Sequence, residues 1–326
     1  MKILVLTGGF HEEMPYEELR ALGVDIRQRD GRIVVGKTED VNRLDGLGFS
    51  HLVLEFLGSF HMNETLPFNP SEHIQGKFAA RFKNLDFEAD FKGKKEEILE
   101  ELNPSIDTVD LDEPDTTFYF LMRGTRIYTG KLLHRFEPAE FTKRKPALKP
   151  FSRPVSLQPR EARCWVNLSG VEKGESLLDP FCGTGGILVE GALAGCKVYG
   201  SDSEGEMVSG SEINLDYYGL GGEMKRCKVQ ELEGRWDRKF DAVVTDPPYG
   251  RSAKVGGEKV RKLYMEAIPE IEKVLKQGKR CVIGAPERLE FEKILEDSEN
   301  FFEITRKFRE KVHGDLAREV FVLRRR

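Results

Sequence analysis

Cysteine is scarce in this chain, and where it occurs it follows no disulfide or metal-binding pattern. The 326 residues contain five cysteines, an odd number, and no Cys-x-x-Cys pair. Neither a disulfide framework nor a zinc centre is therefore predicted, and no metal site is expected. Cys182, which lies in a Gly-rich stretch, is interpreted as a small packing residue.

Long apolar runs are also missing. No stretch approaches the ~18 residues that a membrane span needs. The apolar start of the chain has a core of only five residues before Phe10-His-Glu-Glu, which is too short for a signal peptide and predicts a first β-strand instead. With 39% hydrophobic and 33% charged residues, we expect a cytoplasmic protein without a membrane partner.

Excess positive charge is absent overall but present locally. The formal net charge is −5, yet the stretch from Arg123 to Arg163 holds eleven Lys or Arg against three acids. Two interpretations stay open for this local excess of +8: a solvated linker, or a strip that contacts the phosphates of a nucleic acid.

The first part of the chain predicts two small α+β units. Residues 1–60 follow a β-α-β-β-α-β order, typical of a ferredoxin-like unit, with Asp30-Gly31 as a hairpin turn. A second unit is expected at 61–136, and it ends in a hairpin over 116–133. Three prolines mark 137–150 as an ordered or semi-rigid linker.

The remainder, 151–326, alternates strands with helices. This alternation predicts an α/β fold with a largely parallel sheet. The last two strands, expected at 302–308 and 319–324, have no helix between them, so one of them should run antiparallel.

A Gly-rich loop follows the first strand of this α/β region. The strand Ser176-Leu-Leu-Asp leads into Pro-Phe-Cys-Gly-Thr-Gly-Gly, a run that lets a ligand approach bare backbone before a helix begins. Asp202 ends the next apolar run, at about the ~20-residue offset of a ribose-binding carboxylate. Asp179 before the turn suits a cationic ligand, and S-adenosylmethionine carries such a cation.

The most specific motif is Asp246-Pro-Pro-Tyr, at the carboxyl end of a buried strand, where open α/β sheets bind ligands. Pro247 and Pro248 stiffen the loop and remove two N–H donors, which leaves carbonyls to accept from a substrate amine. Tyr249 offers a flat face for an extruded base. Guanine presents N1–H and N2–H2 side by side, which suits the two oxygens of Asp246.

On these motifs the sequence resembles the class I S-adenosylmethionine-dependent amino-methyltransferases, whose signature is [D/N]-P-P-[Y/F/W]. Together with the late motif His313-Gly-Asp-Leu-Ala-Arg, they look like the archaeal tRNA guanine-N2 methyltransferases that modify position 10 and carry a THUMP domain. Phe151–Ala162 is similar to the segment before their cofactor loop. The resemblance covers 151–326 with specific motifs; 109–133 is similar to the end of a THUMP domain, and 1–60 corresponds by position and order only.

The resemblance implies a Rossmann-like class I methyltransferase domain at 151–326, with a mostly parallel seven-stranded sheet, preceded by a ferredoxin-like unit (1–60), a THUMP-like unit (61–136) and a linker (137–150). It implies methyl transfer from S-adenosylmethionine to N2 of a tRNA guanosine, with catalysis by Asp246, Pro247, Pro248 and Tyr249. The cofactor-binding residues would be Asp179, Phe181, Gly183, Thr184, Gly185, Gly186, Asp202 and Asp246.

Several alternatives stay open. The chain could act as an N6-adenine or rRNA guanine-N2 methyltransferase, or bind tRNA without catalysis. One or two methyl groups could be added, and a small activator subunit remains a candidate partner of what we expect to be a monomer.

Two departures from the family pattern concern the site. Asp315 replaces the usual Ser of the late motif, which puts the role of that loop in doubt. Lys228-Val229 stand where relatives place an Asp-Ala, so the adenine-contacting acid is not identified, and Glu231 is a poor substitute.

Overall fold

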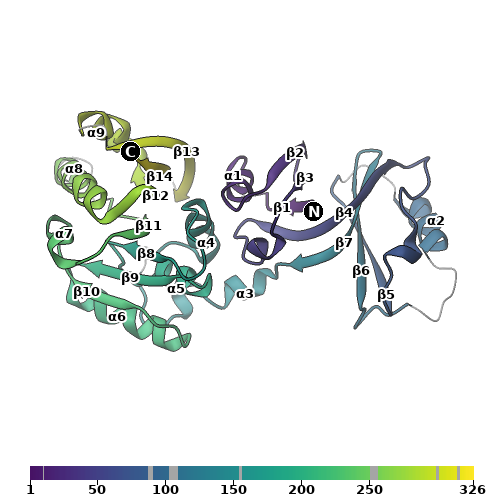
Figure 1. Ribbon diagram of the computed structural model, residues 1–326, viewed down its shortest axis with the longest axis horizontal. Coiled ribbons are helices and arrows are strands. Elements are labelled where there is room, and N and C mark those ends of the chain that lie inside the picture. The colour runs from purple at the N-terminus through teal and green to yellow at the C-terminus, as the bar shows by residue number, and fades with distance from the viewer. Residues whose placement is uncertain are drawn as a thin grey trace. The chain divides into compact units, whose positions relative to one another are not determined.

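The computed structural model describes residues 1–9, 11–86, 91–102, 109–153, 156–249, 256–298, 301–313 and 316–326. The chain divides into two compact units (Figure 1). One comprises Met1–Gly9, Gly23–Asp45 and Ser50–Glu137; the other comprises Phe10–Leu22, Gly46–Phe49 and Pro138–Arg326. This division reflects which segments pack together; the domain limits at 60, 136 and 150 remain a prediction. No helix in the described parts is long and apolar enough to cross a bilayer.

The N-terminal unit is built on one seven-stranded sheet of order β2-β3-β1-β4-β7-β6-β5. Its strands are β1 (Lys2–Thr7), β2 (Asp25–Asp30), β3 (Ile33–Lys37), β4 (Ser50–His61), β5 (Phe78–Asn84), β6 (Thr116–Arg123) and β7 (Arg126–Arg135). The first four lie in the order β2-β3-β1-β4 with antiparallel neighbours, as in a ferredoxin-like sheet. Outside the sheet lie α2 (Lys92–Leu102), a 3₁₀ turn η2 (Pro70–Glu72) and another, η1 (Val41–Leu44), where a second helix was expected.

Strand β4 is longer than expected. The sequence pattern predicts a strand over His51–Phe56, whereas β4 spans Ser50–His61. It continues to His61 through a register shift at Phe56/Gly58 and pairs with both β1 and β7. Gly58 has φ +154, and a Cβ there would lie 2.6 Å from Pro67 Cγ, so only glycine fits this bulge. One sheet therefore runs through both the 1–60 and the 61–136 segments.

The C-terminal unit holds a second seven-stranded sheet, of order β10-β9-β8-β11-β12-β14-β13. Its strands are β8 (Ser176–Asp179), β9 (Lys197–Asp202), β10 (Glu223–Arg226), β11 (Phe240–Thr245), β12 (Leu275–Pro286), β13 (Phe302–His313) and β14 (Leu316–Arg325). The first five pair in parallel, and β14 is antiparallel to both neighbours. The Rossmann-like fold and the antiparallel final strand are thus confirmed.

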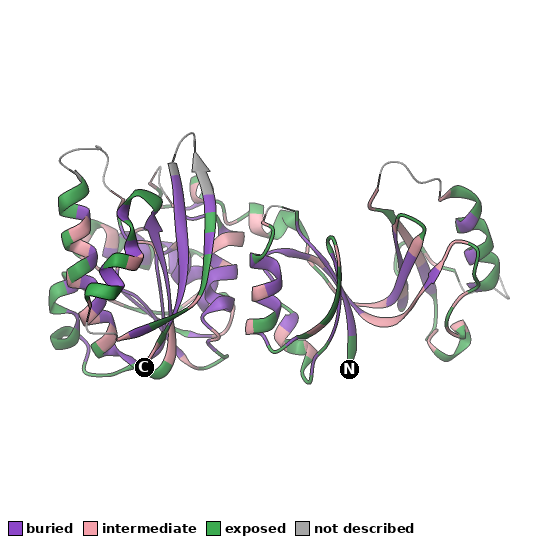
Figure 2. Ribbon diagram, turned by 90° about the horizontal axis from the view of Figure 1, so that it is seen from above, coloured by how far each residue is buried: buried purple, intermediate pink, exposed green. Residues whose placement is uncertain are grey.

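Helices cover both faces of this sheet, and much of the ribbon of its strands has the purple of buried residues in Figure 2. Neighbouring residues of β11 illustrate why: Ala242 and Val244 pack in one core with Trp165, whereas Val243 packs in the other with Tyr264 and Phe291. The helices are α1 (Met14–Ala21), α3 (Pro138–Thr142), α4 (Pro159–Leu168), α5 (Gly186–Leu193), α6 (Gly205–Tyr217), α7 (Leu232–Arg235), α8 (Gly256–Val274) and α9 (Phe291–Asp297), with 3₁₀ turns at Pro146–Leu148, Val229–Glu231 and Glu287–Leu289.

Helix α1 belongs to the C-terminal unit despite its early place in the chain. Its fully buried Glu18 accepts hydrogen bonds from Gly48 N (2.7 Å), Phe49 N (3.1 Å) and Asn167 Nδ2 (2.8 Å). Burying a carboxylate is costly unless its oxygens are hydrogen-bonded. Three donors meet that need, so Glu18 ties α1 and the 46–49 loop to helix α4.

Candidate methyl-transfer site

The Gly-rich loop lies between β8 and the N-terminus of α5. Gly183 and Gly185 have φ of +50 and +73, a left-handed conformation that suits glycine. Cys182 N donates to Ser201 O over 2.9 Å, and Gly185 N donates to Cys182 O over 2.8 Å, which fixes the turn. The loop exposes backbone at the carboxyl edge of the sheet, where a nucleotide-like ligand can approach closely.

Asp202, at the end of β9, is held against the same loop. Its Oδ2 accepts from Gly183 N (3.1 Å) and its Oδ1 from Glu204 N (3.0 Å). The two backbone donors fix the orientation of the carboxylate, and each oxygen retains accepting capacity for a ligand hydroxyl. The predicted ribose contact therefore fits this geometry.

Asp179 is buried at the end of β8. Thr245 Oγ1 donates to its Oδ1 over 2.7 Å, and Phe181 N donates over 3.1 Å. Burial raises the pKa of Asp179 to about 7, although these hydrogen bonds lower it. The negative charges of Asp202 and Asp246 also raise the pKa, so this edge favours a cation.

Asp246 and Tyr249 contact each other at the end of β11. The Tyr249 hydroxyl donates to Asp246 Oδ1 in a short hydrogen bond, while Arg318 Nη1 lies 3.4 Å from Oδ2. Among the described residues no protein donor is bonded to the Pro247 carbonyl, whereas Tyr249 O accepts from Arg288 Nη2 over 2.9 Å. The loop thus retains the carbonyl acceptor that the two prolines predict.

The buried Arg318 contacts Asp246, and the sequence analysis assigned no role to this arginine. Arg318 on β14 is 5% exposed and lies over the Trp165 ring, 4.9 Å from its centroid. It binds Glu310 through Nε and Glu161 through Nη2, the latter over 3.0 Å. One guanidinium therefore orients three carboxylates, including the catalytic candidate.

Two residues of this cluster lie in segments that the sequence analysis singled out, but neither was predicted to belong to the site. Arg318 ends the late motif, and Glu161 lies in the segment before the cofactor loop, but Glu310 on β13 belongs to no motif. Burial raises the pKa of Glu310 to about 6, partly offset by Arg318. Asp315 and the side chain of His313 lie outside the described residues.

A cavity of about 330 Å³ lies beside the Gly-rich loop. It is lined by residues that follow three neighbouring strands and by one helix residue, including Phe181, Ser203, Lys228, Val229 and Leu263. Glu231 is not among the described residues that line it.

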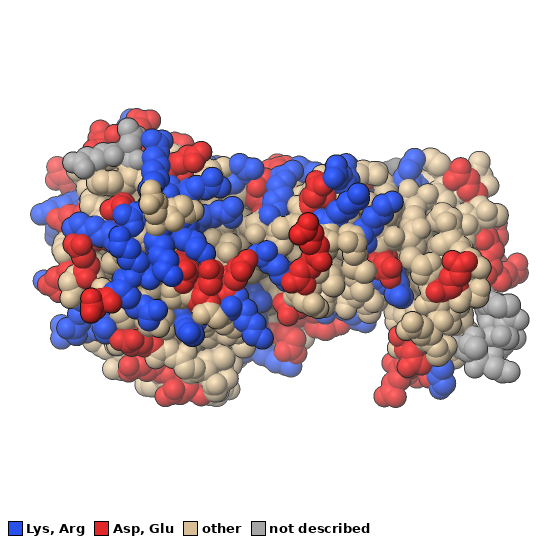
Figure 3. Space-filling view, viewed as in Figure 1, with Lys and Arg blue, Asp and Glu red and all other residues tan. Residues whose placement is uncertain are grey.

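The local excess of positive charge at 123–163 is largely paired. In the N-terminal unit Arg123 contacts Asp30 and Lys131 contacts Glu55, over 3.0 and 3.1 Å. In the C-terminal unit Arg144 forms a two-point contact with buried Glu190. Figure 3 shows Lys and Arg gathered over the C-terminal unit with acids among them. Local sequence charge therefore overstates the free charge of this stretch.

Among the described residues no group of three His, Cys, Asp or Glu side chains could hold a metal ion. The chemistry that the site offers is that of carboxylates, carbonyls and an aromatic ring around a glycine loop.

Comparison with known proteins agrees with this geometry. A family model for the UPF0020, RMKL-like methyltransferase domain matches residues 146–319. The chain is 32% identical to the tRNA (guanine(10)-N2)-dimethyltransferase of Methanothermobacter thermautotrophicus, with 100% of each chain covered, and 33% identical to that of Pyrococcus abyssi, with 98% of each covered. The structure of TrmN from Thermus thermophilus matches 100% of both chains at a TM-score of 0.55 and 21% identity, which shows a shared fold. The chain therefore belongs to the tRNA (guanine(10)-N2)-dimethyltransferase family.

Proposed function

We propose that this protein transfers methyl groups from S-adenosylmethionine to the exocyclic N2 of guanosine 10 in tRNA, in the cytoplasm. The observation that carries the proposal is the position of Asp246 and the Pro247 carbonyl, which offer hydrogen-bond acceptors at the sheet edge beside the glycine loop. This arrangement receives an amine next to a cofactor site, as amino-group methylation requires.

The residues at the loop fit S-adenosylmethionine. Gly183 and Gly185 give the ligand access to backbone, Asp202 can accept from ribose hydroxyls, and Asp179 favours a positive charge nearby. The cavity beyond Phe181 has apolar walls for the adenine ring. The bound cofactor supplies an electrophilic methyl group on a sulfonium.

Asp246 would hold and orient the guanine. Its two oxygens can accept from N1–H and N2–H2, and the Pro247 carbonyl can accept the second N2 proton. Because the Tyr249 hydroxyl donates to Oδ1 in this structure, a guanine that uses both oxygens has to displace it. The displaced phenol ring then provides the flat face for base stacking.

Asp246 is also the group that can take the proton that N2 loses on methylation. Burial raises the pKa of Asp246, which strengthens it as a proton acceptor, and the charge of Arg318 partly opposes that shift. Guanine N2 is a weak nucleophile, so orientation and charge stabilisation supply most of the acceleration.

Incubation of the protein with a tRNA transcript and S-adenosylmethionine, followed by mass spectrometry of the nucleosides, tests the proposal. We expect mono- and dimethylated guanosine from the wild-type transcript and none when position 10 carries adenosine. Methyladenosine, or methylguanosine that persists in the position-10 variant, would contradict it. The proposed active form is a monomer, and its activity with and without a small activator subunit is measured in the same assay.

A further inference from the structure

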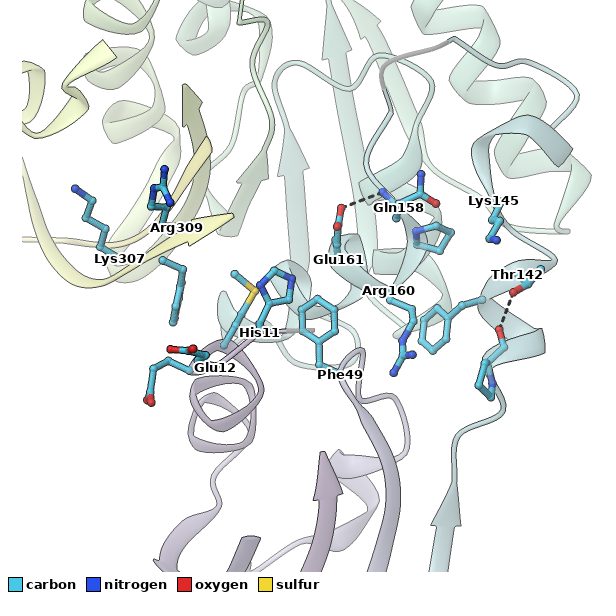
Figure 4. Close-up of a pocket in the computed structure, with 16 residues that line it drawn as sticks. His11, Glu12, Phe49, Thr142, Lys145, Gln158, Arg160, Glu161, Lys307 and Arg309 are labelled. Carbon is cyan, nitrogen blue, oxygen red and sulfur yellow. Dashed lines mark hydrogen bonds between the residues drawn. The ribbon is translucent and has the colours of Figure 1, made fainter. Parts of the chain in front are cut away.

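A second cavity, of about 980 Å³, opens in the C-terminal unit beside the Arg318 cluster. Figure 4 shows His11 and Phe49 in its middle, Lys307 and Arg309 on one side, and Arg160 and Lys145 on the other. Lys145 and Arg160 belong to the basic stretch from Arg123 to Arg163, whereas His11, Phe49, Lys307 and Arg309 belong to no motif found in the sequence.

The cavity is connected to the methyl-transfer site through two contacts. Glu161 lines the cavity and accepts from Arg318 Nη2 over 3.0 Å. Arg318 Nη1 in turn lies 3.4 Å from Asp246 Oδ2. The guanidinium of Arg318 therefore links a carboxylate on the cavity wall to Asp246, the candidate catalytic carboxylate.

The middle of the cavity suits a flat ring. His11 packs on Phe49 with ring centroids 4.8 Å apart, and its side chain remains 18% exposed, whereas Phe49 is 3% exposed. Burial lowers the pKa of His11, which disfavours the charged imidazolium, although Nε2 lies 3.6 Å from Glu310 Oε1. The exposed part of a ring that packs against an aromatic side chain offers a stacking surface for a nucleobase.

One of the two ends of the cavity suits a phosphate. At the other end Lys307 is paired with Glu292 and Glu319, and Arg309 with Glu287, so the charges of these cations are already balanced by carboxylates. The exposed Lys145 has no hydrogen-bond or ion-pair partner for its ammonium among the described residues. A phosphate would therefore give the Lys145 ammonium a partner of opposite charge, which Lys307 and Arg309 already have.

Size and surface argue for a nucleotide as the occupant. The cavity lies at the upper end of the about 300–1,000 Å³ range of ligand sites, so it has room for a base together with its sugar and a flanking phosphate. The large apolar side chains Met14, Phe49 and Phe308 are each less than a tenth exposed. Because charged residues form much of the rim, a protein partner would find little exposed apolar surface there.

We infer that this cavity binds the unpaired nucleotide next to the methylated guanosine, with its base on His11 and a flanking phosphate on Lys145. The inference rests on the proposed function and adds a binding site for the RNA strand that leads into the active site.

The lysines at 143 and 145 provide a matched test. Both are exposed, but Lys143 is paired with Glu140 and does not line the cavity. We expect Lys145→Ala to raise the KM for tRNA several-fold and to lower the slope of log Kd against log salt by about 0.7–0.9, the value for one lost phosphate contact. Lys143→Ala should change neither quantity. Equal effects of the two variants would overturn the inference.

A photoreactive benzoylphenylalanine placed at Thr142, on the exposed rim, locates the RNA directly. We expect it to crosslink within three nucleotides of the methylated guanosine, and crosslinks confined to distant nucleotides, or none, would overturn the inference. The wild-type protein separates the two proposals in this experiment. If it leaves tRNA unmethylated, the proposed function fails, whereas normal methylation with equal lysine variants removes only the cavity assignment.

Discussion

Arg318 lies 3.4 Å from Asp246 Oδ2 through Nη1, and the same guanidinium holds Glu161 and Glu310. Burial raises the pKa of Asp246, and the positive charge of Arg318 lowers it. Arg318 therefore acts as a positioning residue that also opposes the protonation of Asp246.

We expect Arg318→Gln to move the acid limb of the kcat–pH profile to higher pH, because the charge of Arg318 lowers the pKa of Asp246 and its loss lets Asp246 protonate at higher pH. Arg318→Lys keeps the charge and should leave the limb near its wild-type position while kcat falls through lost orientation. Thermal unfolding of both variants monitors stability, since an uncompensated buried charge costs about 3–5 kcal/mol. An unchanged acid limb in Arg318→Gln would refute the role in ionisation.

Removal of the Tyr249 hydroxyl alone and removal of the whole ring should have different effects on the KM for tRNA. Tyr249→Phe removes the hydrogen bond to Asp246 Oδ1 that the substrate has to displace, so its KM for tRNA should equal or fall below the wild-type value. Tyr249→Ala removes a stacking face worth about 1–3 kcal/mol, and its KM should rise by about 5- to 150-fold. Steady-state kinetics on tRNA measure both values. Equal losses in the two variants would show that the hydroxyl takes part in catalysis.

The sequence predicted that the three acids of the candidate site lie near one another. Asp179 and Asp202 end β8 and β9, Asp246 directly follows β11, and the carboxyl ends of these neighbouring parallel strands meet at one edge. The alternation of strands and helices predicted the largely parallel sheet, and the lack of a helix between the last two strands predicted that one of them runs antiparallel.

The remaining features depend on contacts between distant segments. Glu18 and Asn167 are 149 positions apart, and Glu310 joins Arg318 only because β13 and β14 form a hairpin. The length of β4 depends on a bulge at Gly58. Local patterns contain no information on such pairings, which is why the sequence predicted helix α1 but not its packing in the C-terminal unit, and did not predict the Arg318 cluster.

Asp179 should make the free protein less stable as the pH rises. Burial raises its pKa to about 7, above the ~3.9 of an unfolded aspartate. Between these values the folded state holds a proton that the unfolded chain has lost, so the contribution of Asp179 to stability falls as pH increases from about 4 to 7.

The neutral variant Asp179→Asn should therefore gain stability relative to wild type across that window, by up to about 4 kcal/mol. Urea unfolding at pH 5, 6, 7 and 8 measures the gain. The exposed substitution Asp216→Asn serves as a control and should show a constant difference. A constant difference for Asp179→Asn as well would mean that its carboxyl titrates normally.

Asp202→Ala should weaken binding of S-adenosylmethionine by at least an order of magnitude. A hydrogen bond to a charged group contributes about 1.5–3 kcal/mol, and the variant also loses the bond that holds Gly183 N. The adjacent exposed residue provides the control, because Glu204→Ala keeps the backbone N–H that binds Asp202. Titration calorimetry with S-adenosylmethionine and S-adenosylhomocysteine gives the affinities. Equal affinities for Asp202→Ala and the control would remove Asp202 from the cofactor site.

Single-turnover methylation of tRNA by Asp246→Asn tests the central claim most directly, with cofactor affinity measured on the same variant. The amide keeps the size of the carboxylate but must point a donor at one of the two guanine donors. We predict that the rate of methyl transfer falls by about 100- to 1,000-fold while the Kd for S-adenosylmethionine changes less than threefold. Transfer to guanosine 10 at near the wild-type rate would contradict the assignment of Asp246 as the group that holds the guanine amine.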